Sequence, residues 1–350
     1  MMKRNIVVTC IGIILLTILT GCGRKESTIS KEYDFGVVYT STVNKESNIS
    51  TYTDSGDYVE TAKINVGGIN LANFSKRTIT NKDKVYYTMP VLGNKSQDFI
   101  IELNKKDLSY SKIQNSNKRS VTSFDVDDTY AYLGVSSLSE TNLSKVKIEN
   151  NNVENQISIE GQCIYLFEDN DYIYTFNVIN NDTLNYINLF QLNKADFSVI
   201  NTIKIENSLF VTDAVMKDHT IYALINRDGA DVLSNIMVKI HLDSQEVENV
   251  EIPFNNLNSL YAVDNDLYII EGSYTNSEVT QNRICRFNIH TKDMQTFNFE
   301  NQHTLTVMNN NKLYSTDGIN MYIYDVKNGF NLLSNFELKT DKDMVLSAIF

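Results

Sequence analysis

The sequence predicts an all-β fold, and three features lead to it: the composition, a recurring tyrosine motif and the pattern of the two ends. Of the 350 residues, 20 are Tyr and 16 are Phe, whereas 2 are Pro and none is Trp. Aromatic side chains favour strands, and alanine, the strongest helix former, is scarce. With 42% hydrophobic and 21% charged residues, the chain has the composition of a folded protein and not of a disordered one.

The first residues have the pattern of a leader. Lys3 and Arg4 precede an apolar stretch over 6–19, which is the charged and then hydrophobic sequence of a secretory signal. The stretch is too short to cross a bilayer as a helix. It ends in the tetrapeptide LTGC at 19–22, which resembles the lipobox of bacterial lipoproteins.

The resemblance to the lipobox implies a lipid anchor. In bacterial lipoproteins the chain is cut before the cysteine, and a diacylglycerol is attached to its sulfur, so Cys22 is expected to carry two acyl chains and to hold the protein stably at the membrane. We expect 1–21 to be a signal peptide, 22–32 a lipid-anchored tether and 33–350 the folded domain, on the extracytoplasmic face of the cell membrane. An ordinary secretory signal with an unmodified Cys22 is the alternative.

A short motif, in which an Asp or Asn turn is followed by an apolar residue and Tyr, recurs along the chain with spacings of 44 to 48 residues. Asn and Asp suit such turns because they tolerate a left-handed backbone. Seven units of about 47 residues account for the chain that follows the leader. The tyrosines of the motif are Tyr86, Tyr130, Tyr174, Tyr222, Tyr268 and Tyr314, with a weaker copy at Tyr39.

Each unit is predicted to contain four short strands, named A to D. An alternating stretch such as 209–216 gives strand A, the tyrosine strand gives B, and turns such as 193–196 join C to D with hairpin chemistry. Four strands in a repeat of this length are typical of a β-propeller blade, because the period lies between those of WD40 and kelch repeats. A solenoid is the structural alternative, but its repeats are usually shorter or helical.

The two ends of the folded region predict a closed ring. The segment 344–350 has the pattern of a strand A with no B after it, and 33–40 that of a strand B with no A before it. Pairing the two would complete the first blade and remove open strand edges. The expected fold is therefore one seven-bladed β-propeller with four-stranded blades, the first closed by the C-terminal strand. A six- or eight-bladed ring is the alternative.

One segment also resembles a known superfamily. The pentapeptide IYTFN at 173–177 is similar to the YVTN phrase of bacterial propellers, whose superfamily includes quinoprotein-like repeats. The resemblance concerns architecture and occurs in one blade. Quinoprotein enzymes of this superfamily carry tryptophans between their blades, and this chain has none. No cofactor is therefore expected.

Charge and cysteine content limit the partners and the cross-links. The net charge of -12 makes nucleic acid and anionic membrane surfaces poor partners. In the folded region two cysteines remain, Cys163 and Cys285, and they fall at different points of the repeat. We expect both to be buried as small apolar residues, with a disulfide between them as the alternative.

A search for catalytic motifs finds no glycine-rich phosphate loop, no nucleophile elbow and no zinc-binding pattern. Three of the four histidines fall in or beside turns, and no metal site is expected. Paired aspartates in A–B turns resemble the start of a calcium loop, but its glycine and distal glutamate are missing. Turn formation explains them, and calcium binding is the alternative. The pairs are Asp125/Asp127, Asp169/Asp171 and Asp264/Asp266.

The predicted topology assigns a binding surface to one face. A–B and C–D turns lie on one side of an antiparallel blade, and B–C and D–A loops lie on the other, where the loops are longer and differ between blades. On that side Lys76 and Arg77 are expected beside Lys118 and Arg119, so that four cations could bind an anionic ligand. Loop variation without selection and ordinary solvated charge are the alternatives.

These observations predict a non-enzymatic, lipid-anchored propeller that binds a protein, peptide or glycan partner in the cell envelope and is a monomer. A propeller hydrolase of the lactonase or glycan-cleaving kind is the alternative, with Asp213 on a strand A as its best candidate residue. The tether enters strand B from the A–B side. That side is therefore expected to face the membrane, and the variable loops are expected to face outward.

Overall fold

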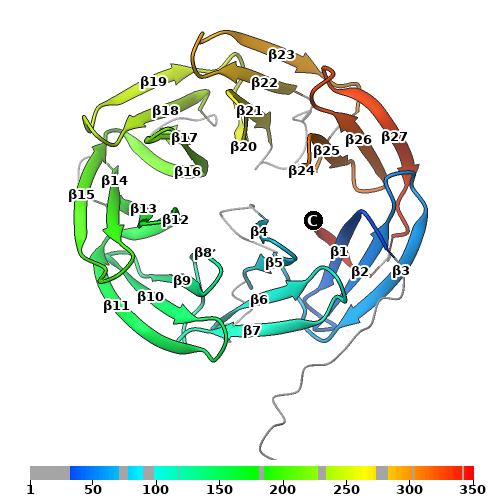
Figure 1. The fold of residues 1–350 in the computed structure, drawn as a ribbon, viewed down its shortest axis with the longest axis horizontal. Coiled ribbons are helices and arrows are strands. Elements are labelled where there is room, and N and C mark those ends of the chain that lie inside the picture. Colours follow the sequence, from blue (N-terminus) through cyan, green and yellow to red (C-terminus); the bar gives the residue numbers. More distant parts are fainter. Residues whose placement is uncertain are drawn as a thin grey trace, which may run out of the picture.

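Seven four-stranded antiparallel sheets stand side by side around a common axis in the part of the chain that the structure describes (Figure 1). The computed structural model describes residues 32–70, 78–89, 98–116, 118–180, 185–227, 234–272, 283–301, 303–340 and 343–350. The predicted seven-bladed β-propeller is confirmed, and the six- and eight-bladed alternatives are excluded. No helix among the described residues is long and apolar enough to span a membrane.

The four strands of each blade are ordered A, B, C, D from the axis outward, and blade 1 is the one that contains β1. From blade 1 to blade 7, the A strands are β28 (Val345–Ile349), β4 (Ile79–Asn81), β8 (Ser123–Val126), β12 (Gln162–Glu168), β16 (Ser208–Lys217), β20 (Leu257–Val263) and β24 (Leu305–Asn309). The B strands are β1 (Phe35–Ser41), β5 (Lys84–Tyr87), β9 (Tyr130–Ser136), β13 (Tyr172–Ile179), β17 (Thr220–Arg227), β21 (Asp266–Glu271) and β25 (Lys312–Thr316).

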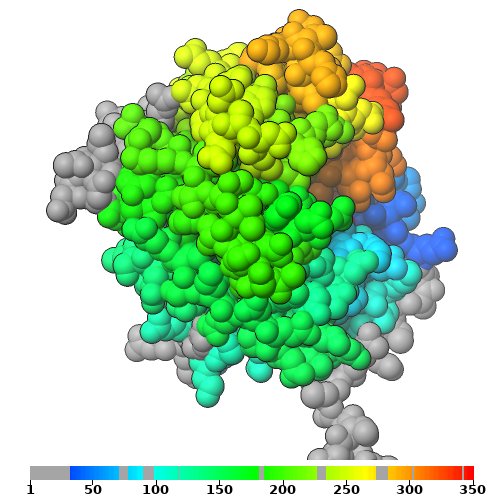
Figure 2. Space-filling view, turned by 60° about the vertical axis from the view of Figure 1, so that its left-hand side comes forward, coloured from blue at the N-terminus to red at the C-terminus, as the bar shows by residue number. Residues whose placement is uncertain are grey.

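The two outer strands follow in the same order. The C strands are β2 (Glu46–Tyr52), β6 (Phe99–Asn104), β10 (Glu140–Lys147), β14 (Tyr186–Asn193), β18 (Ile236–His241), β22 (Arg283–Asn288) and β26 (Asn320–Asp325). The D strands are β3 (Tyr58–Ile64), β7 (Tyr110–Gln114), β11 (Asn152–Glu160), β15 (Val199–Ile205), β19 (Val247–Glu251), β23 (Met294–Asn298) and β27 (Asn331–Glu337). Blades 3 to 6, coloured teal to orange, follow one another around the outer wall in Figure 2.

The first blade joins the two ends of the domain, as the sequence predicts. Strand β28 pairs with β1 in antiparallel register, with Val37 opposite Ile349. Beyond the strand, the Gly36 N–H donates to the Phe350 carbonyl at 2.9 Å, and the Phe350 N–H donates to the Gly36 carbonyl at 3.0 Å. The ring is therefore closed by main-chain hydrogen bonds between its first and last strands.

Burial explains which strands are apolar along their whole length. A blade packs between two neighbours, so both faces of its middle strands are covered, and all seven residues of β1 are buried. Outer strands such as β11 have one row of side chains in solvent and alternate accordingly. The buried apolar residues form seven clusters, and each cluster fills the gap between two adjacent blades.

The third residue of strand B marks the repeat in space. It is a buried tyrosine in blades 2 to 7, namely Tyr86, Tyr132, Tyr174, Tyr222, Tyr268 and Tyr314. In blade 3 the motif tyrosine of the sequence, Tyr130, is the first residue of β9 instead, and in blade 1 the position belongs to Val37 and not to Tyr39. A shift of two residues keeps a side chain on the same face of a strand, so the sequence pattern fits either register.

Both cysteines of the folded region are free thiols, buried in blades 4 and 6. Cys163 in β12 is 1% exposed, and Cys285 in β22 is fully buried. Burial raises the pKa of the Cys163 thiol to about 12 and that of Cys285 to about 11. The prediction of buried, apolar cysteines is confirmed, and the alternative of a disulfide between them is excluded.

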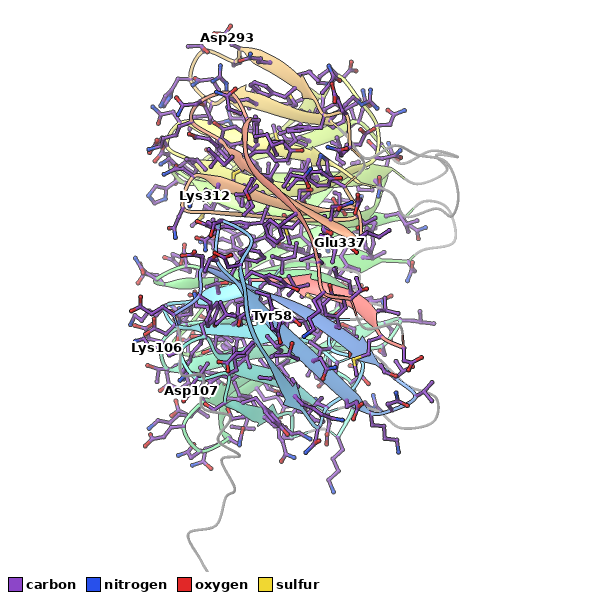
Figure 3. All side chains as sticks on the ribbon, turned by 90° about the vertical axis from the view of Figure 1, so that its right-hand side faces the viewer. Tyr58, Lys106, Asp107, Asp293, Lys312 and Glu337 are labelled. Atoms are coloured by element: carbon purple, nitrogen blue, oxygen red, sulfur yellow. The ribbon has the colours of Figure 1, made fainter. Side chains whose placement is uncertain are left out.

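The turns divide between the two faces as the topology requires. In Figure 3 the C–D turn residues Lys106 and Asp293 lie on the same side of the ring as Lys312, which begins β25 after an A–B turn. Glu337, the last residue of a D strand, lies toward the opposite side. We call the first side the A–B face and the second the D–A face.

Candidate functional site

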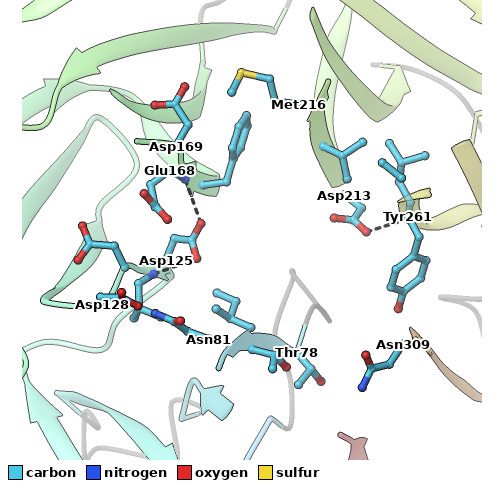
Figure 4. Close-up of a pocket in the computed structure, with 18 of the residues that line it drawn as sticks. Thr78, Asn81, Asp125, Asp128, Glu168, Asp169, Asp213, Met216, Tyr261 and Asn309 are labelled. Atoms are coloured by element: carbon cyan, nitrogen blue, oxygen red, sulfur yellow. Dashed lines mark hydrogen bonds between the residues drawn. The ribbon is translucent and has the colours of Figure 1, made fainter. Parts of the chain in front are cut away.

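The candidate site is a cavity of about 1030 Å³ at the A–B face, on the propeller axis. Its wall comes from the ends of six A strands, from β4 round to β24, and from Phe350 of the first blade. The volume is at the upper end of the range of small-molecule sites, which is roughly 300 to 1,000 Å³. Figure 4 shows the residues that face it.

The repeat determines which residues reach this cavity. Strand A pairs with strand B so that the residue seven positions before each B-strand tyrosine lies opposite that tyrosine, as Val307 does with Tyr314. These residues form one layer of the wall: Ile79, Asp125, Phe167, Val215, Tyr261 and Val307. The next residue of each strand forms a second layer: Thr80, Val126, Glu168, Met216, Ala262 and Met308.

Blades 3 and 4 make one side of the cavity acidic. The carboxylates there belong to Asp125 on β8, to Asp127 and Asp128 in the turn that follows, to Glu168 on β12 and to Asp169 beside it. Figure 4 shows Asp125, Asp128, Glu168 and Asp169 together on this side. We call these five residues the acidic wall.

Turn chemistry explains why two of these acids are fixed. Asp127 Oδ1 accepts the N–H groups of Thr129 at 2.8 Å and Tyr130 at 2.7 Å, and its Oδ2 accepts the Tyr132 hydroxyl at 2.7 Å. Burial opposes ionisation, but these hydrogen bonds lower the pKa of Asp127. Asp169 repeats the arrangement with the Tyr174 hydroxyl at 3.0 Å. Asp127 and Asp169 are therefore turn-forming residues, as the sequence predicts for these two members of the aspartate pairs.

Lys194 connects the acids of the two blades. It lies in the C–D turn of blade 4, and its Nζ is 3.0 Å from Asp127 Oδ2 and 2.5 Å from Glu168 Oε2. The ammonium also lies 5.2 Å from the centre of the Tyr132 ring. Burial works against the charge, yet the hydrogen bonds to Glu168 and Asp127 raise the pKa of Lys194. Lys194 is a cation held between blades 3 and 4.

Glu168 is the acid whose protonation is most sensitive to its surroundings. Burial raises its pKa to about 7, and the nearby charges of Asp125 and Asp127 act in the same direction, while Lys194 opposes the rise. Its backbone N–H donates to Asp125 Oδ2 at 2.9 Å, which fixes the end of β12 against β8. At neutral pH this side chain can therefore both donate and accept a proton.

The opposite side of the cavity is mostly apolar. Strands β16, β20 and β24 contribute Val215, Met216, Leu260, Val307 and Met308, and Phe350 completes the surface. We call these six residues the apolar wall. Tyr261 and Asn309 add two polar groups at its edge, and Figure 4 shows both across the cavity from Glu168.

Asp213, a residue predicted from sequence to bind a ligand, lies in the cavity wall but is only 4% exposed. Its Oδ1 accepts the Tyr165 hydroxyl at 2.5 Å and the Ala214 N–H at 2.9 Å, and its Oδ2 accepts the Leu260 N–H at 2.8 Å. These partners come from blades 4, 5 and 6. The carboxylate therefore joins three blades.

The two members of the predicted cationic cluster that the structure describes lie on the D–A face. Lys118 and Arg119 are exposed in the D–A loop between β7 and β8, and neither lines the cavity. Lys76 and Arg77 lie outside the described residues, as does the predicted lipidation site Cys22. The proposed grouping of the four cations stays a prediction.

Sequence reasoning missed Glu168 and Lys194. It noted the aspartate pairs that surround Glu168, but it placed the binding surface on the D–A face. A signal was available, because the residues six and seven positions before each B-strand tyrosine are those that face the cavity. Lys194 has no such signal, since it approaches from a C–D turn.

The described residues offer no group of three or more His, Cys, Asp or Glu side chains that could hold a metal ion. The cavity residues themselves offer fixed charge, apolar contact and, in Glu168, a carboxyl with a pKa of about 7. Fold and cavity together define a β-propeller with a two-sided cavity, acidic on one side and apolar on the other, at the mouth of its axis.

Comparison with known proteins gives the fold alone. The WD40 domain of Pan2 from Neurospora crassa matches with a TM-score of 0.53 and 7% identity, over 81% of this chain and 86% of that one. BamB from Moraxella catarrhalis matches with a TM-score of 0.50 and 11% identity, over 90% and 88%. Cobalt-substituted apocarotenoid oxygenase from Synechocystis matches with a TM-score of 0.53 and 9% identity, over 92% and 93%. No family model and no curated protein sequence matches the chain.

Proposed function

We propose that the protein is a lipid-anchored, extracytoplasmic binding module of the cell envelope that holds part of a protein, peptide or glycan partner in the cavity of the A–B face. The observation that carries the proposal is a cavity of about 1030 Å³ with a rigid wall. Hydrogen bonds of Asp125 and Asp213 to main-chain N–H groups of neighbouring blades fix that wall. A preformed cavity binds with less loss of conformational freedom than a mobile one.

The lipobox supports the location, and the path of the chain bears on the orientation. Strand β1 begins at Phe35 on the A–B face, next to Phe350 in the cavity wall. If Cys22 carries the lipid, a tether of about ten residues reaches at most about 36 Å. The proposal therefore places the cavity on the side of the membrane surface.

Blocking the cavity tests the binding function. Ala262→Trp places a large side chain in the wall, whereas Ala195→Trp places the same side chain on an exposed turn of the same face, at a position that does not line the cavity. Both variants and the unaltered mature protein are immobilised, and the envelope components that they retain are measured by quantitative mass spectrometry. We expect Ala262→Trp to lose at least one component that Ala195→Trp keeps. Identical retention by all three would refute binding in the cavity.

The anchor is tested separately. Cys22→Ser, expressed in a bacterium that processes lipoproteins, should no longer incorporate a clickable fatty acid and should leave the membrane fraction. A membrane-bound Cys22→Ser protein that still carries the label would contradict lipidation at this cysteine.

A hydrolase of the lactonase or glycan-cleaving kind is the second candidate, and Glu168 is the observation that favours it. A carboxyl with a pKa near 7 can act as a general acid or base at neutral pH. Hydrolysis of a panel of lactones and oligosaccharides by the unaltered protein, with loss of at least 100-fold in Glu168→Gln, would support this function. Equal rates in both proteins would exclude Glu168 from the chemistry.

A further inference from the structure

We propose that the cavity selects a cationic peptide segment that also carries apolar side chains, so that its cations meet the acidic wall and its apolar groups meet the apolar wall. The inference rests on the proposed function, in that it assigns a ligand class to the cavity described there. Charge, surface character and size each contribute to it independently.

The charge of the cavity favours a cation. Six carboxylates line it, together with the two ammonium groups of Lys105 and Lys194. A third ammonium group, that of Lys82, pairs with Asp128 at the rim, so carboxylates remain in excess. Lys194 is already engaged by Asp127 and Glu168. Burial lowers the pKa of Lys105 below its ordinary value, and the nearby charge of Asp83 opposes this only in part. An excess of negative charge in a concave site attracts positive ligands and repels anionic ones.

Glu168 shows that the acidic wall is short of positive charge. Its neighbours are Asp125 and Asp127 from blade 3, Asp169 on its own chain segment and the single cation Lys194. Burial in this surrounding makes ionisation of Glu168 costly, and a second cation placed there would reverse part of that cost. A ligand ammonium or guanidinium group beside Glu168 would therefore favour the ionised carboxylate.

The apolar wall rules out a ligand that is polar throughout. A simple polyamine or a neutral glycan would leave Met216 and Met308, which are partly exposed, in water, whereas an apolar side chain would cover them. Covering apolar surface is worth about 25 cal/mol per Å². Methionine side chains are flexible and adapt to apolar ligands of different shape. The ligand is thus expected to have two kinds of side chain, which alternate or face opposite ways.

Size distinguishes a peptide segment from a folded partner. A cavity of about 1030 Å³ accommodates a few side chains and their main chain, and not a folded domain. The partner is therefore either a short peptide or an exposed segment of a larger protein. The two sources share one chemistry and are separated by the experiment below.

Isothermal titration calorimetry with synthetic peptides tests the ligand class. The probe is an acetylated, amidated peptide of five alternating leucines and lysines. Two matched peptides replace its lysines with glutamates or its leucines with serines. We expect the leucine–lysine peptide to bind. The peptide in which serines replace the leucines should bind at least tenfold more weakly, and the peptide in which glutamates replace the lysines should show no detectable binding. Binding should also weaken as NaCl is raised from 50 to 500 mM, since salt screens the attraction.

Variants of the acidic wall test whether the peptide binds in the cavity. Asp128→Asn combined with Glu168→Gln removes two acidic groups from the acidic wall, and Asp243→Asn removes an exposed acidic group outside the cavity. The first should weaken peptide affinity at least tenfold, and the second should change it less than twofold. Far-ultraviolet circular dichroism checks that each variant is folded. Equal affinity for the acidic and basic peptides, or equal affinity of the two variants, would overturn the proposal.

The experiments separate an error in the ligand class from an error in the proposed function. If Ala262→Trp loses an envelope component but no basic peptide binds, the cavity is a binding site and the ligand class is wrong. If basic peptides bind while Ala262→Trp retains every component, the cavity binds free peptides and the envelope partner binds elsewhere. A basic peptide that competes with a retained protein would identify a segment of that protein as the ligand.

Discussion

Asp213 shows how a single carboxylate can hold a propeller together. It is almost fully buried, and it accepts hydrogen bonds from a tyrosine of blade 4 and from an N–H group of blade 6. Hydrogen bonds to an ionised acceptor are stronger than neutral ones. Removal of this acceptor would also leave buried donors unsatisfied, at the cost of their desolvation energy. We therefore expect replacement of Asp213 to lower the stability of the fold.

Asp213→Asn should lower the free energy of unfolding by about 2 kcal/mol, since an amide offers one acceptor atom in place of two charged ones. Urea denaturation followed by tyrosine fluorescence measures the change. Asp243→Asn, on an exposed turn, serves as the matched control and should stay within about 0.5 kcal/mol of the unaltered protein. Equal midpoints for the two variants would show that the Asp213 carboxylate does not join the blades energetically.

Glu168 should make stability depend on pH. Its pKa rises from an ordinary value of 4.5 to about 7 in the folded protein, chiefly through burial. Folding thus favours the protonated acid, so its contribution to stability is complete below pH 4.5 and is lost as the pH rises through about 7. Asp125, Asp127, Asp169 and Lys194 face the same carboxyl and tune this range.

Glu168→Gln removes this titration and leaves Lys194 paired with Asp127. The variant should gain stability relative to the unaltered protein, on the order of 1 kcal/mol, between about pH 5 and pH 8. Urea midpoints of both proteins, measured across that range, give the difference at each pH. A difference that does not change with pH would mean that Glu168 has the same pKa in the folded and unfolded chains.

At the level of elements, the turns do more than reverse the chain. The C–D turn of blade 4 reaches across to the A–B turn of blade 3 through Lys194, whose side chain is 13% exposed. On the rim, Lys82 pairs with Asp128, but both side chains are more than half exposed. Water screens the second pair and not the first, so two ion pairs between turns should differ in their energetic value.

The two ion pairs can be compared directly. Lys194→Met should destabilise the fold by about 2 to 3 kcal/mol, because it leaves Asp127 and Glu168 without their shared cation. Lys82→Met should change the free energy of unfolding by less than about 0.5 kcal/mol. Urea denaturation at pH 8, where both acids are largely ionised, measures both. A larger loss for Lys82→Met would reverse the assignment of the buried and exposed pairs.

Strand order and blade closure could be predicted from the sequence, whereas the cavity could not. Each tyrosine strand and each Asn or Asp turn is a local pattern, and local patterns repeat visibly along a chain. The contact between Lys194 and Asp127 joins two blades and depends on how far each turn projects. No local sequence pattern encodes how far a turn projects toward the neighbouring blade. The assignment of Tyr130 to a position that Tyr132 occupies has another cause, because a shift of two residues along a strand keeps the side chain on the same face.

For the whole molecule, the closing strand is the decisive element. Strand β28 covers β1, and its residues Ala348 and Ile349, with Phe350 after it, contribute buried side chains to the clusters on both sides of blade 1. Without it the inner edge of β1 would be open, and its unpaired N–H and C=O groups would be available to other chains. The ring gains its stability as a unit.

Deletion of residues 344–350 should therefore abolish cooperative thermal unfolding and give soluble aggregates, as measured by calorimetry and size-exclusion chromatography. Val345→Ser, at a position that is 60% exposed in the same strand, should leave the unfolding midpoint within about 3 °C. Addition of a synthetic peptide with the sequence of 344–350 should restore part of the monomeric fraction. A truncated protein with an unchanged midpoint would show that the remaining strands of blade 1 suffice.

The closure by β28 also determines when the protein can finish folding. Strand β1 emerges early in synthesis, but its inner partner emerges only after blades 2 to 7 have been made. Until then the inner edge of β1 stays unpaired, so for almost the whole time of translation the nascent chain exposes a strand edge that can pair with other chains. A chain of this topology cannot reach its final state until β28 is released.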